Sequence, residues 1–208
     1  MKHSVVLLLV MILVSTVGNA CGESPSFSVL RIGINAEDIE TLDPHLAASF
    51  QDRMIVDMVF NGLLRYVPGN APQFEPDLAE HIPEPFIVDG QQIWTFKLKR
   101  GVYFHTGPET AAYEFTADDV VYSLQKAADP QRSAYAGEYA GMRFEKIDDY
   151  TCRIVLDTPL SPNLFFPKVS DYAGGLIVSS RALQALGDSA FSAYPVGTGP
   201  FAFQTHLA

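Results

Sequence analysis

The side chains that could do chemistry lie far apart along this chain and form no recognisable reactive set. His45, His81 and His105 form no H-x-H or H-E-x-x-H pair, and there is no C-x-x-C pair, so metal-ligand spacing is missing. We expect these histidines at the surface or in loops. The serines lack the G-x-S-x-G pattern of a hydrolase nucleophile. Gly197–Gly199 is too short for a phosphate-binding loop, and Pro200 has no amide donor. We therefore predict a protein that is not an enzyme and that has no metal and no cofactor.

Two pairs of adjacent carboxylates have structural explanations. Asp118 and Asp119 follow Thr116, the predicted N-cap of a helix, where the positive end of the helix dipole favours carboxylates. Asp119 stands at the third helical position, which suits a variant of the capping box. Asp148 and Asp149 fall at a turn between two predicted strands. We expect neither pair to act as a catalytic dyad.

The elements that must position the side chains follow from hydrophobic periodicity. Ile93–Lys99 alternates apolar and polar residues, which predicts a half-buried strand. Its inward-facing residues are Trp94, Phe96 and Leu98. Val102–Phe104 extends the chain again after a glycine. A helix then follows Thr116, with an apolar stripe formed by Val120, Val121, Leu124 and Ala128.

The remaining segments complete a pattern of alternating helices and strands. Further strands are predicted at Val29–Ile34, Phe144–Asp148 and Thr151–Leu156. Helices are predicted at Asp52–Leu64, at Leu160–Val169 with proline interruptions, and at Ser180–Leu186, closed by Gly187. The first of these helices carries one apolar side made of Met54, Ile55, Met58, Val59 and Leu63. Residues 131–142 are expected to form a loop or irregular helix, and Pro44 favours a turn at Thr41–His45.

The first 28 residues carry the features of an exported protein. Lys2 precedes an apolar run, Val5–Val14, that is too short to span a bilayer comfortably and suits residues 1–20 as a signal peptide. Small residues before Cys21 fit ordinary cleavage after Ala20, and Cys21 itself fits the acylated cysteine of a bacterial lipoprotein. A lipoprotein, a soluble secreted form and an uncleaved anchor all remain open. Residues 21–28 are expected to form a tether.

Composition limits the class of partner. The chain has 208 residues, 48% hydrophobic and 18% charged, which is typical of a globular protein. Its net charge of -10 makes nucleic acid an unfavourable partner. Cys152 shares a strand face with Ile154 and Leu156, so we expect a buried free thiol rather than a disulfide to Cys21.

Several motifs in series resemble one family. Residues 94–107 read W-T-F-K-L-K-R-G-V-Y-F-H-T-G, and residues 115–124 read F-T-A-D-D-V-V-Y-S-L. T-L-D-P at residues 41–44 comes before them, followed by F-N-G-L-L-R-Y at residues 60–66, and P-V-G-T-G-P-F at residues 195–201 comes after them. We expect the glycines of this last motif to adopt backbone angles that a side chain disfavours. The series resembles the family 5 extracellular solute-binding proteins, which are the oligopeptide-, dipeptide- and nickel-binding components of ABC importers.

The resemblance implies a fold. It predicts a mixed α/β architecture of the type II periplasmic-binding-protein class, in which two lobes are hinged around a buried ligand. Members of the family are several hundred residues long. We therefore expect residues 29–208 to hold most of the first lobe, as an N-terminal fragment without the second lobe. Apolar surface that the second lobe would cover is then exposed, which predicts poor solubility.

The resemblance also implies a function and a site. The chain is expected to capture peptides at the outer face of the cell membrane or in the periplasm and to deliver them to an ABC permease. The ligand-facing segments of the family match Ser49, Phe50 and Gln51, then Tyr135, and then Asp171 and Tyr172. Ordinary loop packing is the alternative for each of them. The nickel-binding members use an arginine near Asp171, and its absence here argues against a nickel chelate.

Two hypotheses from other classes remain. A secreted hydrolase with an acidic surface lacks a nucleophile and metal spacing, but hydrolysis of model esters or peptides would support it. A non-functional truncated fragment of a binding protein is the other. An in-frame continuation of several hundred residues beyond Ala208 would support the binding-protein hypothesis, whereas a stop there would contradict it for this chain.

Overall fold

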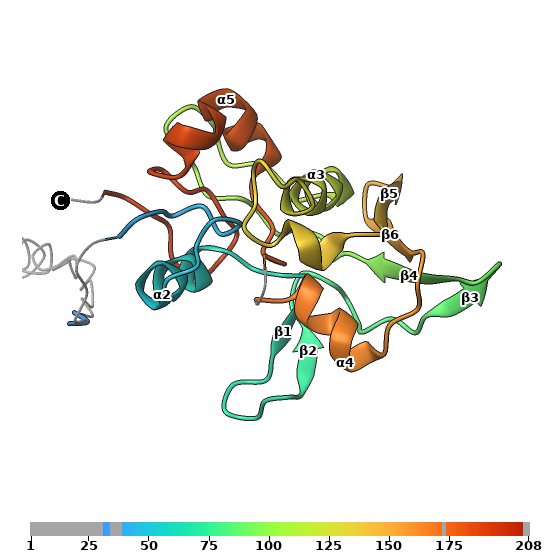
Figure 1. Ribbon diagram of the computed structural model, residues 1–208. Helices are drawn as coiled ribbons and strands as arrows, with labels where there is room; N and C mark the ends of the chain where they lie inside the picture. The colour runs from blue at the N-terminus through green and yellow to red at the C-terminus, as the bar shows by residue number, and fades with distance from the viewer. Residues whose placement is uncertain (1–30, 34–38, 172–173, 206–208) are drawn as a thin grey trace, which may run out of the picture. The chain divides into compact units, whose positions relative to one another are not determined.

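The computed structural model describes residues 31–33, 39–171 and 174–205. The chain divides into two units, Met1–Asn35 and Ala36–Ala208, and every helix and strand below belongs to the second unit (Figure 1). In the first unit, the described residues 31–33 are exposed and have no regular secondary structure. The predicted signal peptide, the tether with Cys21 and the rest of the predicted strand Val29–Ile34 lie outside the described residues.

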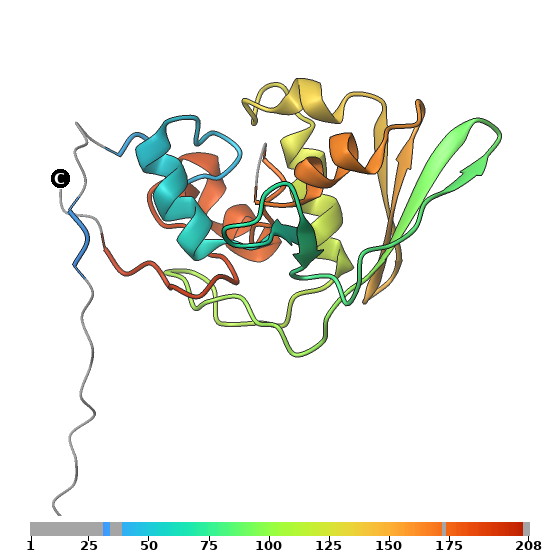
Figure 2. The same ribbon diagram turned by 90° about the horizontal axis from the view of Figure 1, so that it is seen from below.

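A four-stranded antiparallel sheet forms the main framework of the second unit. Its strands are β3 (Phe86–Val88), β4 (Gln91–Lys97), β6 (Thr151–Leu156) and β5 (Met142–Asp148), in that spatial order (Figures 1 and 2). Asp89 and Gly90, both with positive φ, make the tight turn between β3 and β4. Where β4 pairs with β6, Trp94 lies opposite Ile154 and Phe96 lies opposite Cys152. A mixed α/β fold is therefore confirmed.

The central strand shows the predicted alternation. Trp94, Phe96 and Leu98 are at most 1% exposed, whereas Lys97 and Lys99 face solvent. The strand itself ends at Lys97, and Leu98 makes only an isolated bridge to Ala79. The extension predicted at Val102–Phe104 is likewise no strand, because only Tyr103 forms a bridge there, to Glu114.

Helix α3 (Ala117–Ala127), which the sequence predicts after Thr116, packs against this sheet. The Asp119 carboxylate accepts a hydrogen bond from the Thr116 backbone amide at 3.1 Å, which completes the expected cap. Asp148 and Asp149 lie at the β5–β6 turn, where the Asp148 carboxylate accepts from the Tyr150 amide at 2.8 Å. Both carboxylate pairs therefore have the predicted structural roles.

The proline-rich stretch after β6 forms α4 (Pro162–Phe165) and the 3₁₀ turn η2 (Phe166–Val169). Trp94 holds it against the sheet, because its indole stacks on Phe165 with centroids 4.5 Å apart and meets Phe166 edge-on at 5.4 Å. The predicted loop before β5 contains a second short 3₁₀ turn, η1 (Ala136–Tyr139). These short elements place several loop residues that matter below.

Helix α2 differs from its prediction in bounds and in orientation. It spans Phe50–Val59 rather than Asp52–Leu64, because the Ser49 hydroxyl caps it by accepting from the Asp52 amide at 3.1 Å. The chain then turns extended, and Leu64 already begins β1 (Leu64–Tyr66), which pairs with β2 (Phe74–Pro76). The buried face carries Asp52, Val56 and Val59, whereas Met54, Ile55 and Met58 are only partly buried.

Two glycine predictions also need correction. Helix α5 (Ser180–Phe191) does not end at Gly187, which instead forms a kink with φ 76° inside it. Gly197 and Gly199 do not adopt positive φ. They are needed for close approach instead, since a Cβ at Gly197 would lie 2.1 Å from the Val59 carbonyl oxygen. No helix within the described ranges is long and apolar enough to cross a membrane.

Candidate functional site

The predicted ligand-facing segment after the Thr41–His45 turn becomes the start of helix α2. Ser49 is the helix cap, and its hydroxyl is therefore engaged with the backbone of the first turn. Phe50, the first helical residue, is 74% exposed, and Gln51 follows it partly buried. These residues were expected in a loop; the capped helix instead fixes their spacing on a rigid element.

Arg53, one turn into the same helix, joins this segment to two other predicted places. Its guanidinium donates to the Tyr135 hydroxyl at 3.4 Å and to the Asp171 backbone carbonyl at 2.9 Å. The Tyr135 hydroxyl in turn donates to the Ala47 carbonyl at 2.5 Å. Tyr135 and Asp171 are thus brought to the N-terminal end of α2, although they are 82 and 118 residues from Arg53 in sequence. Tyr172 lies outside the described residues.

Arg53 is the member of this cluster that the sequence did not single out. It is the only basic residue of Phe50–Val59, and it lies two positions after Gln51. A lone cation beside a candidate ligand-facing segment was the available signal. These two partners could not be read from the sequence, because they are a hydroxyl group and a backbone carbonyl on distant loops.

The Asp171 carboxylate accepts from the backbone amides of Asp171 and Tyr66, but one of its oxygens stays unpaired in the described part of the chain. Its Oδ1 atom is buried and has no hydrogen-bond partner among the described residues. Burial raises the pKa of this carboxyl, while the backbone amides of Asp171 and Tyr66 and the Arg53 charge oppose that shift. A buried acceptor next to an arginine can receive an ammonium or amide donor, and the guanidinium can receive a carboxylate. The cluster therefore suits a ligand that carries both charges.

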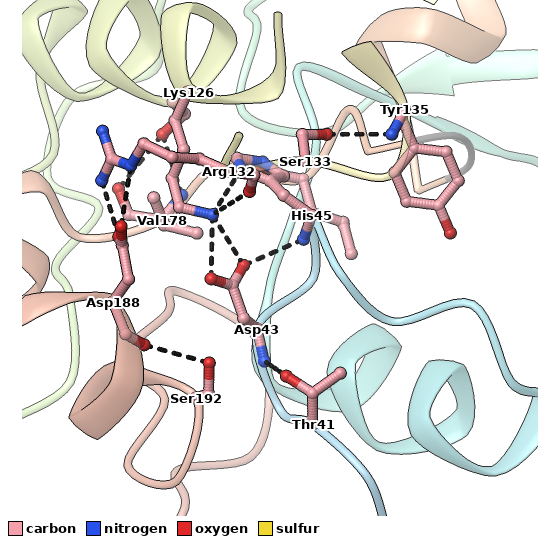
Figure 3. A network of polar contacts seen from close by, with 12 residues as sticks. Thr41, Asp43, His45, Lys126, Arg132, Ser133, Tyr135, Val178, Asp188 and Ser192 are labelled. Atoms are coloured by element: carbon pink, nitrogen blue, oxygen red, sulfur yellow. Dashed lines mark hydrogen bonds and ion pairs between the residues drawn. The ribbon is translucent and has the colours of Figure 1, made fainter. Parts of the chain in front are cut away.

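A buried ion pair supports the two segments that carry these groups. Lys126 of α3 contacts both carboxylate oxygens of Asp43, at 3.0 and 2.8 Å, and both side chains are at most 1% exposed (Figure 3). The same ammonium group lies 3.3 Å from Nδ1 of His45 and donates to the Arg132 carbonyl at 3.2 Å. Burial lowers the pKa of Lys126, and the Asp43 charge opposes that shift.

This network continues directly into the candidate site. The Ala134 amide donates to the His45 carbonyl at 2.9 Å, and the Tyr135 amide donates to the Ser133 hydroxyl at 3.0 Å (Figure 3). Arg132 forms an ion pair with Asp188 of α5 at 2.7 Å. The turn before Ser49 and the loop before Tyr135 are therefore held to each other and to two helices.

The burial of His45 corrects the expectation of a surface histidine. The residue does sit in the predicted turn, but its side chain is fully buried. Burial is the main cause that lowers the pKa of His45 to about 4, helped by the Lys126 charge and opposed by Asp43 and the Leu176 carbonyl. The imidazole is therefore neutral at pH 7. Its Nε2 atom lies 3.0 Å from the Leu176 carbonyl, so Nε2 carries the proton and Nδ1 accepts from Lys126.

The other candidate groups are structural. His81 is exposed, and His105 lies 2.9 Å from the Gly199 carbonyl. Cys152 is a buried free thiol, as predicted, and burial raises its pKa to about 12, which makes it unreactive. Over residues 39–171 and 174–205, no group of three or more histidine, cysteine, aspartate or glutamate side chains could hold a metal ion.

Solved structures with this fold define the class of protein. The solute-binding protein MoaA of A. tumefacien, in complex with mannopinic acid, is 40% identical, with a TM-score of 0.70 over 82% of this chain and 33% of that one. DppA of Helicobacter pylori, in complex with the peptide STSA, is 27% identical with a TM-score of 0.67, over 82% of this chain and 35% of that one. The described chain therefore has the fold of part of a periplasmic binding protein.

Sequence comparisons then give the family. Residues 73–207 match the bacterial extracellular solute-binding proteins, family 5. "Di/tripeptide-binding protein 2" of Pseudomonas aeruginosa is 36% identical over 70% of this chain and 29% of its own length. "Heme-binding protein A" of Haemophilus influenzae is 36% identical over 70% of this chain and 28% of its own length. The chain belongs to the family 5 solute-binding proteins and spans less than a third of the length of these two relatives.

Proposed function

We propose that this protein is the substrate-binding component of an ABC importer and that it captures peptides. The cluster of Arg53, Tyr135 and Asp171 carries the proposal, because the Arg53 guanidinium binds the backbone of Asp171, whose buried Oδ1 atom has no hydrogen-bond partner within the described ranges. A short peptide carries a carboxylate and an ammonium group that match these two charges. The names of the di/tripeptide-binding relatives and the peptide complex of DppA support the same ligand class.

Capture is proposed to work by closure of two lobes on the peptide. The closed form is favoured by a ligand that contacts both lobes, and the permease recognises that form. This chain supplies one wall of the cleft, from α2 and the loops at Tyr135 and Asp171. Phe50, which is 74% exposed, stands beside that wall and is available to cover a bound peptide.

Peptide binding is tested by saturation-transfer NMR on the 208-residue chain with millimolar Ala-Ala, N-acetyl-Ala-Ala and Ala-Ala-amide. We expect Ala-Ala to bind and each blocked peptide to lose about tenfold in affinity, because each loses one charge-assisted contact. Arg53→Gln should remove the distinction between Ala-Ala and its amide, and Asp171→Asn that between Ala-Ala and its acetylated form. Arg65→Gln, a surface arginine paired with Glu75, is the matched control. Equal binding of all three peptides would contradict the proposal.

Export and anchoring form the second part of the proposal. Residues 1–20 direct export, and Cys21 is acylated, so that the protein works at the outer face of the cell membrane. Mass spectrometry of the mature N-terminus in a bacterial host tests both points. Acylation adds a lipid mass that Cys21→Ser abolishes, whereas a free N-terminal Cys21 would show ordinary cleavage.

A further inference from the structure

A separate cavity of about 660 Å³ opens beside the candidate site. It lies between the η1 turn, the adjoining ends of β5 and β6, and the α4–η2 segment. Most of its lining is apolar, from Met142, Leu156, Leu160, Leu164 and Pro167. This volume falls within the range of roughly 300–1,000 Å³ that is typical of small-molecule sites.

Tyr135 is common to the cavity and to the candidate site. Tyr135 lines the cavity, and its hydroxyl contacts the Ala47 carbonyl and the Arg53 guanidinium. The ring packs against Gly174, where an added Cβ would lie 2.8 Å from the tyrosine Cδ2 atom. Tyr135 thus connects the charged cluster to the apolar cavity.

The charged side chains of the lining are already paired. Lys168 forms an ion pair with Glu138, and Asp157 forms one with Arg143 at 2.6 Å. A charged ligand group would have to displace one of these partners, whereas an apolar group can lie against the apolar majority of the lining and gains the free energy of leaving water. The uncharged polar members of the lining are Thr158 and Asn163. The cavity therefore favours an apolar occupant.

Strand pairing, ring stacking and a hydrogen bond hold the walls of this cavity in place. Leu156 and Met142 lie directly opposite each other on β6 and β5. Phe165, next to Leu164, stacks on the buried Trp94. The Tyr139 hydroxyl donates to the Lys168 carbonyl at 3.0 Å and ties η1 to η2. Every lining residue comes from the described part of this chain.

We propose that this cavity is a side-chain subsite that selects peptides with a large apolar residue at the carboxyl-terminal end, which Arg53 holds. The inference rests on the proposed peptide-binding function and adds its specificity. The peptide backbone crosses Tyr135, and an aromatic or branched aliphatic side chain enters between Leu164 and Met142.

The test compares Ala-Phe, Ala-Ala, Ala-Asp and Ala-Lys by the same NMR measurement. We expect Ala-Phe to bind about tenfold or more tightly than the other three, as is usual when a pocket loses a large apolar group. Two substitutions at exposed positions of the lining should remove this preference and leave Ala-Ala unchanged: Leu164→Asn, which makes the wall polar, and Ala140→Phe, which fills the cavity. Ile87→Asn is the matched control, because Ile87 is 56% exposed against 61% for Leu164 and does not line the cavity.

The outcomes separate the subsite from the function on which it rests. Ala-Phe preference that survives both Leu164→Asn and Ala140→Phe would overturn the subsite and leave peptide binding in place. Equal binding of the four peptides to the parent chain would also overturn the subsite and leave peptide binding in place. Failure of every peptide to bind would overturn both proposals. Loss of the preference in Ile87→Asn as well would show a non-specific effect and reject the assignment to this cavity.

Discussion

At the scale of single residues, the pair of Lys126 and Asp43 is an ion pair with both side chains buried. It links positions 83 residues apart, with both charges removed from water. Such a pair contributes little net stability compared with a well-packed apolar pair, but removal of one partner leaves the other charge buried and unpaired. Its role here is positional, since it connects the turn before Ser49 to the loop that leads to Tyr135.

Replacement of that lysine tests this role. Lys126→Met should lower the free energy of unfolding by about 3–5 kcal/mol, because it strands the Asp43 carboxylate in the core. Urea unfolding followed by the fluorescence of Trp94, the single tryptophan, measures the loss. Lys146→Met is the control, since Lys146 pairs with Asp118 at the surface and its loss should barely move the midpoint. Partial recovery is expected when Asp43→Asn is added, and equal midpoints for both lysine variants would refute the argument.

The buried imidazole of His45 makes stability depend on pH. Its pKa in the folded chain is about 4, below the ordinary value of 6.5, so only the unfolded chain takes up this proton between those two values. The contribution of neutral His45 is fully present above pH 6.5 and is lost as the pH falls toward 4. The total is about 3 kcal/mol for a shift of this size.

Comparison of parent and variants isolates this contribution from that of the carboxylates. Between pH 7 and pH 4.5, His45→Gln should lose less unfolding free energy than the parent, because glutamine takes up no proton. His81→Gln alters an exposed histidine and should follow the parent curve. The same pH slope in His45→Gln and in the parent would show that His45 does not titrate as its burial implies.

At the scale of elements, the glycine motif after α5 acts as a close contact between distant segments. The Gly199 amide donates to the Val59 carbonyl at 2.8 Å, and the Phe201 amide donates to the Met58 carbonyl at 3.1 Å. These donors satisfy the carbonyl groups at the end of α2, which its own helix leaves unpaired. The P-V-G-T-G-P-F motif thus caps the C-terminal end of α2, the helix that carries Arg53.

An added methyl group tests this packing. Gly197→Ala should destabilise the fold by about 1–3 kcal/mol, because its Cβ would lie 2.1 Å from the backbone oxygen of Val59, which cannot move aside freely. Gly137→Ala is the matched control, since a Cβ there meets nothing within 4 Å. Thermal unfolding of the two variants gives the comparison, and an unchanged melting temperature for Gly197→Ala would reject the close approach.

At the scale of the whole molecule, large apolar side chains remain exposed within the described ranges. Phe50 is 74% exposed, Leu164 61% and Phe201 54%. Exposed apolar patches favour association. We therefore expect the isolated 208-residue chain to associate in a concentration-dependent way.

Sedimentation velocity over a range of concentrations measures this association. Phe50→Ser should reduce it, because the substitution removes the most exposed large apolar side chain among those described. Thr95→Ser, on the half-buried face of β4, should leave it unchanged. A monodisperse monomer at all concentrations would contradict the expectation.

Much of the local structure follows from the sequence by itself. The period-2 pattern around Trp94 predicted the central strand, and the spacing after Thr116 predicted the capped helix α3. The two aspartate pairs lie at the helix start and at the strand turn where they were predicted. These features depend on neighbours within a few residues, and local patterns report them well. The start of α2 was misplaced because Ser49 caps it two residues earlier than the apolar pattern alone indicates.

The sequence also determined the family, through motifs in a fixed order, and it identified Ser49, Phe50, Tyr135 and Asp171 as candidates. Only the tertiary structure decided how these candidates meet. Arg53 joins two of them through a hydroxyl and a backbone carbonyl, and Lys126 pairs with Asp43 inside the core. Neither contact leaves a periodic or compositional trace, because each depends on segments about 80 residues or more apart that folding alone brings together.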